Sequence, residues 1–161
     1  MVDSVEHGEG LVTFRVRAKA GDGECPACRR RSSRVHARYQ RQLADLPLGG
    51  RQVQIIVHVR RFKCVNPRCG QSTFSEQIPG LTMPFARRTP SLARALADVA
   101  LALAGRPGSR LAAKLAMPCC RDVLIRLIRA QPLPGAGRIE VLGVDLSGVL
   151  SHPSVTSASV A

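Results

Sequence analysis

Four cysteines with metal-ligand spacing are the residues of this chain that point most directly to a chemistry. Cys25 and Cys28 are separated by Pro-Ala, and Cys64 and Cys69 by Val-Asn-Pro-Arg. Thiolates in two short-spaced pairs suit tetrahedral zinc, because each tight turn directs two sulfurs at one ion. We therefore expect one structural Zn²⁺ per chain, and we expect the metal to substitute for a hydrophobic core in this segment.

Other uses of cysteine fit the sequence less well. A redox Cys-x-x-Cys would need a βαβ context, and a disulfide framework would need an oxidising compartment. The polar N-terminus lacks the pattern of a signal peptide, which favours a reduced, cytoplasmic setting. His36 and His58 could replace a thiolate but are not needed. Cys119 and Cys120 are adjacent in a stretch predicted to be helical, and we interpret them as packing residues.

The elements that must position the cysteines are predicted to be strands. Alternating or β-branched patterns predict strands near residues 11–18, 34–40, 53–63 and 72–76, with a turn around Pro47 to Gly50. The longest of them leads directly into Cys64, as a zinc ribbon requires. The fold class is therefore predicted as α+β: a zinc β-ribbon domain at residues 1–78, then a proline-punctuated linker at 79–90.

Three helices are predicted after the linker, in a helix-turn-helix domain at residues 91–131. Thr89-Pro90 is a good helix start, an apolar stripe follows, and Gly105-Arg-Pro-Gly108 should end the helix. Ser109 should cap a short helix to Ala116, and a turn of about three residues should lead to a third helix near 120–130. Exposed arginines of that helix are the first candidates for DNA contacts: Arg121, Arg126 and Arg129.

The charge of the chain indicates a polyanionic partner. Lys and Arg number 24 against 11 Asp and Glu, which gives a net charge of +13 and a pI near 11.1. Residues 29–90 alone hold 13 basic and two acidic residues. Aromatic residues are scarce, so double-stranded DNA fits better than single strands, and no run is long enough to span a membrane. Further candidate contacts in the basic segment are Arg60, Arg61, Arg87 and Arg88.

The chain resembles the N-terminal half of bacterial ISL-three family insertion-sequence transposases from about residue 11 to 145. Besides the cysteine pairs, the resemblance rests on Val59-Arg-Arg-Phe-Lys-Cys64, Thr73-Phe-Ser-Glu76, Ala86-Arg-Arg-Thr89 and Arg121-Asp-Val-Leu124. It implies a zinc-binding domain and a helix-turn-helix that recognise terminal inverted repeats. It also implies a following RNase H-like domain whose Asp, Asp and Glu hold two metal ions.

The sequence departs from that family at the start of the expected catalytic domain. Asp145 closes a segment like the first catalytic strand, but Leu146 replaces the usual second aspartate and no carboxylate side chain follows. Two-metal chemistry needs several carboxylates. We therefore predict a truncated, non-catalytic DNA-binding fragment whose residues 132–161 are a strand remnant and a disordered tail. A zinc-containing transcriptional regulator is the alternative, and a homodimer or an association with a full-length transposase stays open.

Overall fold

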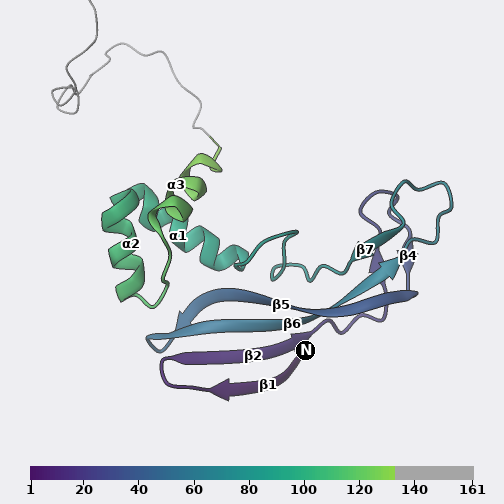
Figure 1. Ribbon diagram of the computed structural model, residues 1–161, viewed down its shortest axis with the longest axis horizontal. Coiled ribbons are helices and arrows are strands. Elements are labelled where there is room, and N and C mark those ends of the chain that lie inside the picture. The colour runs from purple at the N-terminus through teal and green to yellow at the C-terminus, as the bar shows by residue number, and fades with distance from the viewer. Residues whose placement is uncertain (133–161) are drawn as a thin grey trace, which may run out of the picture. The chain divides into compact units, whose positions relative to one another are not determined.

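The structure is a computed structural model that describes residues 1–132, with one mixed sheet, a small hairpin and three helices (Figure 1). Residues Met1–Gln131 form one compact unit. The predictions for Asp145, for the strand that precedes it and for a disordered tail lie outside the described residues.

The main sheet has the strand order β1-β2-β6-β5, and β7 pairs with the end of β6. The strands β2 and β6 are parallel, whereas β1 with β2, β5 with β6 and β6 with β7 are antiparallel. A separate antiparallel hairpin consists of β3 and β4. The bounds of the strands are β1 Val2–His7, β2 Leu11–Arg17, β3 Gly23–Glu24, β4 Arg31–Ser32, β5 Val35–Leu48, β6 Arg51–Lys63 and β7 Thr73–Ser75.

The predicted strands are present, but two features of the sheet differ from the prediction. The strand β5 continues to Leu48, where Gly49 and Gly50, both with positive φ, turn the chain into β6. The strand β1 was not predicted, because every one of its residues is exposed and no burial pattern marks it.

The sheet has a hydrophobic core of its own, contrary to our expectation that the metal substitutes for one. Alternate side chains of neighbouring strands lie on the same face, and that face is packed beneath Ile78 and Leu81 of the chain after β7. The buried residues of this sheet core are Val12, Val16, Leu43, Val53, Ile55, Val57 and Val59.

The segment predicted as a linker, residues 79–90, is bonded to β5. The guanidinium of Arg41 donates to the carbonyls of Met83 and Ala86 at 2.9 and 2.8 Å. The backbone of Ala44 accepts from the amide of Thr89 and donates to the carbonyl of Arg87, each at 3.0 Å. This segment therefore caps part of the free edge of β5 and leads directly into the first helix.

The three helices pack around a second hydrophobic core. They are α1 Pro90–Leu103, α2 Gly105–Lys114 and α3 Arg121–Arg129. As predicted, Thr89 caps α1: its hydroxyl accepts from the amide of Leu92 at 3.2 Å. The buried residues of this helical core are Leu92, Leu96, Ala100, Ala112, Met117 and Leu124. Among the described residues, no helix has the length and apolar character needed to cross a membrane.

The prediction for the start of the second helix was wrong. The first helix ends at Leu103, its C-cap residue Ala104 has a φ of 53°, and α2 begins at once with Gly105 rather than after Ser109. Pro107 fits in the first turn, where its missing N–H would have no partner within the helix. Gly108 is buried, and a Cβ there would lie 3.0 Å from Leu124 Cδ1, so glycine permits close packing with α3.

The connection between α2 and α3 spans residues 115–120, longer than the predicted turn of about three residues. It contains both adjacent cysteines, which were predicted to be helical packing residues. Cys119 packs against the helical core, and its carbonyl accepts from the hydroxyl of Ser109 at 2.6 Å. Cys120 is exposed at the N-cap of α3 and makes no side-chain capping bond.

Candidate metal centre and basic surface

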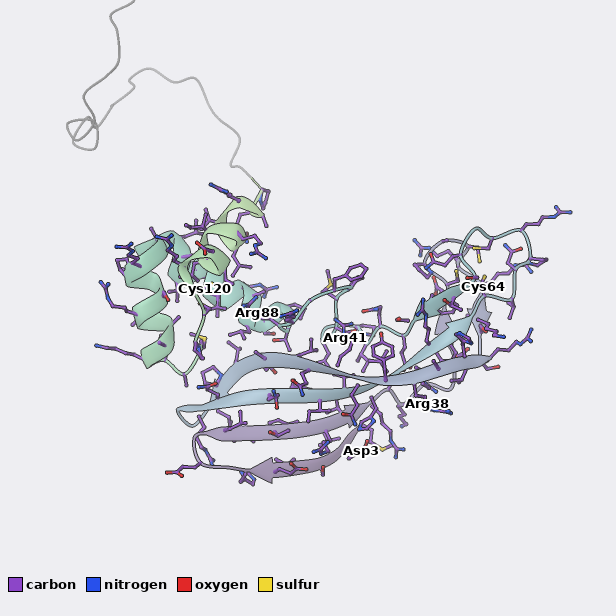
Figure 2. All side chains as sticks on the ribbon, viewed as in Figure 1. Asp3, Arg38, Arg41, Cys64, Arg88 and Cys120 are labelled. Carbon is purple, nitrogen blue, oxygen red and sulfur yellow. The ribbon has the colours of Figure 1, made fainter. Side chains whose placement is uncertain are left out.

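The four predicted metal ligands meet at one end of the long β5–β6 hairpin (Figure 2). Cys25 and Cys28 lie in the loop between β3 and β4. Cys64 follows directly after β6, and Cys69 lies in the loop that leads to β7. The hairpin thus brings the two loops together across 35 intervening residues, and neither His36 nor His58 joins the cluster.

The spacing of the sulfurs fits a tetrahedral zinc ion. The four Sγ atoms lie within 4.8 Å of one another, with Cys28 to Cys64 at 3.6 Å and Cys25 to Cys69 at 4.0 Å. Zn–S bonds of about 2.3 Å at tetrahedral angles place sulfurs about 3.8 Å apart. The observed distances lie on either side of this value and are far longer than the S–S bond of a disulfide. The residues present therefore fit a Cys₄ zinc site.

Backbone amides stabilise the thiolates that such a site needs. The amides of Asn66 and Gln71 each lie 3.5 Å from the sulfur two residues earlier, Cys64 and Cys69 respectively. A hydrogen bond from the backbone of Arg30 and, to a lesser extent, the neighbouring thiols lower the pKa of Cys28 to about 7. For Cys64 the amide of Asn66 also favours the thiolate, but burial and the neighbouring thiols outweigh it and raise the pKa to about 12.

A small aromatic core supports the metal centre. Phe62 at the end of β6 and Phe74 in β7 are buried with Cys25, and their ring centroids are 5.8 Å apart. Gly23 lies against these rings: a Cβ there would be 2.9 Å from Phe62 and 3.2 Å from Phe74. Because both rings are buried, they could not move aside easily. The absence of a side chain at Gly23 thus lets β3 and the first cysteine loop pack on the rings.

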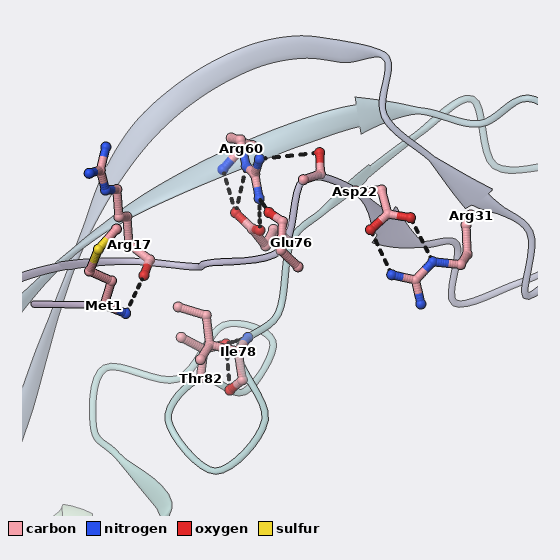
Figure 3. Close-up of polar contacts among 10 residues, drawn as sticks. Met1, Arg17, Asp22, Arg31, Arg60, Glu76, Ile78 and Thr82 are labelled. Atoms are coloured by element: carbon pink, nitrogen blue, oxygen red, sulfur yellow. Dashed lines mark hydrogen bonds and ion pairs between the residues drawn. The ribbon is translucent and has the colours of Figure 1, made fainter.

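A buried ion pair joins the cysteine region to the sheet (Figure 3). Glu76, after β7, accepts from the guanidinium of Arg60 with both carboxylate oxygens, and the amide of Arg60 points to the same group at 3.3 Å. Arg60 also donates to the carbonyls of Ala20 and Gly21, just before β3, and lies over the ring of Phe62. At the β3–β4 hairpin, the guanidinium of Arg31 donates two hydrogen bonds, of 2.7 and 2.6 Å, to the carboxylate of Asp22.

The four arginines predicted from the basic segment lie in different environments. Arg60 is committed to the ion pair and the two carbonyls just described, so its position is structural. Arg61 is exposed on β6 and donates to the hydroxyl of Thr73 at 3.0 Å. Arg87 is exposed and Arg88 half-buried beside the edge of β5, just before α1 (Figure 2).

The three arginines predicted from the last helix are all exposed on α3. Arg126 and Arg129 lie in the last turn of the helix, on the same face as Asp122 of the first turn. Arg121 lies 3.3 Å from the carboxylate of Asp122, so part of its charge is balanced locally. The structure therefore keeps all three accessible but does not bring them together with Arg60 and Arg61.

Sequence reasoning missed a basic cavity that lies beside the end of β2 and the first half of β5. Lys19, Arg38 and His58 line an open cavity of about 730 Å³, together with Arg17, which is paired with Asp3. Only the strand pairing brings these residues together, since Arg17 lies opposite His58 in β6, and His58 lies opposite Gln40 in β5. The sequence alone does not show that β2 and β6 are parallel neighbours. Without that pairing, the position of Arg17 opposite His58 could not be derived.

Comparison with known proteins gives a match to a family model. Residues 22–69 match the model described as the zinc-finger of transposase IS204/IS1001/IS1096/IS1165. No curated protein and no solved structure matches the chain. The match contains all four cysteines that the structure brings together. The segment of residues 22–69 is therefore similar to the zinc ribbon of this group of transposases, and its four cysteines are placed to bind a metal ion.

Proposed function

We propose that this chain binds double-stranded DNA and acts as the end-recognition part of a transposase, with the terminal inverted repeats of an insertion sequence as its site. The observation that carries the proposal is the transposase zinc ribbon at residues 22–69. Within it the zinc ion is structural: it would be held by Cys25, Cys28, Cys64 and Cys69 and would fix the two loops at the end of the hairpin. No step of catalysis is assigned to it.

The distribution of charge supports a DNA partner. The carboxylates of β1 pair with β2: Glu6 lies 2.8 Å from Arg15, and Asp3 lies 2.9 Å from Arg17. Elsewhere basic residues greatly outnumber acidic ones, with 13 against two at residues 29–90. Several phosphate contacts acting together supply most of the affinity for DNA of any sequence.

We propose that α2 and α3 form a helix-turn-helix and that α3 reads the DNA. Leu124 is fully buried in the helical core, while Arg126 and Arg129 point away from it and are exposed. Arginine can pair with guanine through two hydrogen bonds in the major groove. We place Arg126 and Arg129 first among the contacts, Arg121, Arg61, Arg87 and Arg88 next, and we leave Arg60 out because its guanidinium is engaged by Glu76.

We assign no strand cleavage to the described residues. Within residues 1–132, the four cysteines are the one group of three or more metal-ligating side chains close enough to share an ion. Two-metal cleavage of DNA uses carboxylates around ions about 4 Å apart. Cleavage of element-end DNA by the pure chain with magnesium or manganese would overturn this part of the proposal.

Titration of the zinc-loaded chain against two duplexes tests the proposal. One duplex carries the terminal repeat of an ISL3-type element from the host genome, and the other has the same bases in shuffled order. We expect a preference for the repeat of about a thousandfold, which a zinc chelator reduces. Arg126→Ala and Arg129→Ala should each weaken binding to the repeat about tenfold or more. The control Arg15→Ala removes an arginine that already has a carboxylate partner and should change the affinity little.

The outcome also separates the two functional classes. Equal, steeply salt-dependent binding to both duplexes would refute end recognition and leave a basic fragment that binds any DNA. Selection from genomic fragments that returns sites upstream of genes, rather than element ends, would favour the transcriptional regulator.

A further inference from the structure

Phe85, in a turn between the last strand and the first helix, exposes its side chain to solvent. Phe85 is 100% exposed, whereas Phe62 and Phe74 are buried and Phe14 packs against the sheet core. An isolated exposed aliphatic side chain needs no explanation, but a phenylalanine without any cover is unusual. In a chain with four phenylalanines, its position calls for a physical reason.

The backbone at Phe85 forms a strained turn. The amide of Ala86 bonds to the carbonyl of Met83 at 3.2 Å, which closes a turn with Pro84 in its second position. Phe85, in the third position, has a φ of 59°, a conformation that turns of this kind normally give to glycine or asparagine. An aromatic side chain there is an unfavourable choice for folding alone.

The sheet fixes this turn at both ends. Arg41 of β5 donates to the carbonyls of Met83 and Ala86, the first and last residues of the turn, at 2.9 and 2.8 Å. Immediately afterwards, the carbonyl of Arg87 accepts from the amide of Ala44. Figure 2 shows Arg41 directed toward this segment. Because both ends are bonded to β5, the ring of Phe85 is presented from a rigid support.

The surroundings of the ring are positively charged. Arg87 and Arg88 follow it, and Arg41 lies beneath the turn. Within the described part of the chain, none of these three arginines forms an ion pair with a carboxylate. The first turn of α1, which begins at Pro90, carries no acidic residue, and the carboxylate of Asp45 accepts from the hydroxyl of the N-cap residue Thr89. An exposed apolar ring two and three residues before two arginines fits a ligand with anionic edges and flat apolar faces.

We propose that Phe85 is a DNA wedge: its ring stacks against the bases at one step of a duplex whose phosphates are bound by Arg87 and Arg88. Phenylalanine side chains inserted in this way unstack a base step and kink the duplex, while nearby basic side chains hold the backbone. The inference rests on the proposed DNA binding and adds a contact that deforms the DNA. The strained turn is then explained as a support that keeps the ring available.

The replacement Phe85→Gly separates this role from a structural one. Glycine relieves the strain of the positive φ and removes the ring, so the melting temperature of the free chain should stay the same or rise. Affinity for the preferred duplex should fall about tenfold, because stacking on bases is lost. The slope of affinity against salt should not change, since no phosphate contact is removed. Phe85→Trp should retain binding, and Leu48→Ala, which shortens another exposed apolar side chain, should bind like the parent chain.

A direct readout comes from duplexes in which the fluorescent adenine analogue aminopurine replaces one base at a time. Binding of the parent chain should brighten the probe at one step, and Phe85→Gly should abolish that signal. If the parent chain binds DNA but Phe85→Gly has equal affinity and no probe responds, the wedge is refuted and the proposed function stands. If the parent chain binds no duplex, both are refuted. If Phe85→Gly alters only the self-association of the free protein, the ring contacts a second copy instead of DNA, which also overturns the wedge.

Discussion

The substitution Glu76→Ala should destabilise this protein strongly, although the sequence analysis names Glu76 only as the last residue of a family motif and assigns it no role. The side chain of Glu76 is 5% exposed, and that of its partner Arg60 is 21% exposed. The alanine variant would leave the guanidinium of Arg60 with the two carbonyls of Ala20 and Gly21 and without a counter-charge. Desolvation of an unpaired charge, rather than the loss of a favourable pair, is the main cost.

The magnitude follows from burial and from the hydrogen bonds lost. Removing one partner from a fully buried pair costs about 3–5 kcal/mol. Water can reach part of Arg60, so we expect about 2–3 kcal/mol of lost unfolding free energy for Glu76→Ala. For a compact unit of this size, that loss lowers the melting temperature by about 5–10 °C.

Urea denaturation of the zinc-loaded chain, followed by circular dichroism, measures this loss, and Glu6→Ala is the matched control. It makes the same chemical change at a carboxylate that also binds an arginine, but both side chains of the Glu6 and Arg15 pair are exposed. An exposed pair contributes about 0–1 kcal/mol. The variant Glu76→Leu with Arg60→Met should recover much of the stability, because it replaces both charges with apolar groups.

Equal stabilities of Glu76→Ala and Glu6→Ala would refute the structural role that we assign to Arg60. The arginine would then be free to contact DNA, as first predicted from the sequence. A large loss in Glu76→Ala that the double replacement does not recover would point instead to a packing role of the Glu76 stem.

Three further predictions concern the metal centre. Cys64→Ser should lower bound zinc from about one ion per chain to none, measured by atomic absorption after dialysis. The control Cys120→Ser should keep the full amount of zinc. Full loading of both variants would contradict the assignment of Cys64 as a ligand. Zinc affinity should fall as the pH decreases, because binding displaces the proton that Cys64 retains at neutral pH with its pKa of about 12; titration calorimetry in two buffers should show proton release, and none would contradict the ligand role of this thiol. Gly23→Ala should weaken zinc binding without unfolding the helices, since its Cβ would lie 2.9 Å from the ring of Phe62; unchanged zinc affinity would show that β3 can move away.

The metal centre could be predicted from the sequence because its signal is local. Each pair of cysteines is set by a short turn, so spacing alone indicates that two sulfurs point at one ion. Strands β2 and β6 were equally visible, since both are rich in β-branched residues. The start of α1 was visible in Thr89 and Pro90, where capping chemistry fixes the boundary.

The features that could not be predicted depend on contacts between distant segments. Gly105 to Gly108 has the composition of a helix end, yet the packing of Gly108 against Leu124 makes it the first turn of a helix. Arg60 reads as one more basic residue until β7 brings Glu76 beside it. The strand β1 carries no burial signal at all, and pairing with β2 alone defines it.

The presence of two cores in the N-terminal region changes the role that zinc must have. Seven buried residues hold the sheet together without any contribution from the cysteines. The metal centre rests on a smaller cluster of Cys25, Phe62 and Phe74 at the end of the same strands. Since β6 runs through both clusters, with Val59 in one and Phe62 in the other, the sheet positions the zinc loops rather than the reverse. We therefore expect zinc to fix the loops at the open end of the β5–β6 hairpin, where the ion pair of Arg60 and Glu76 joins them to the sheet.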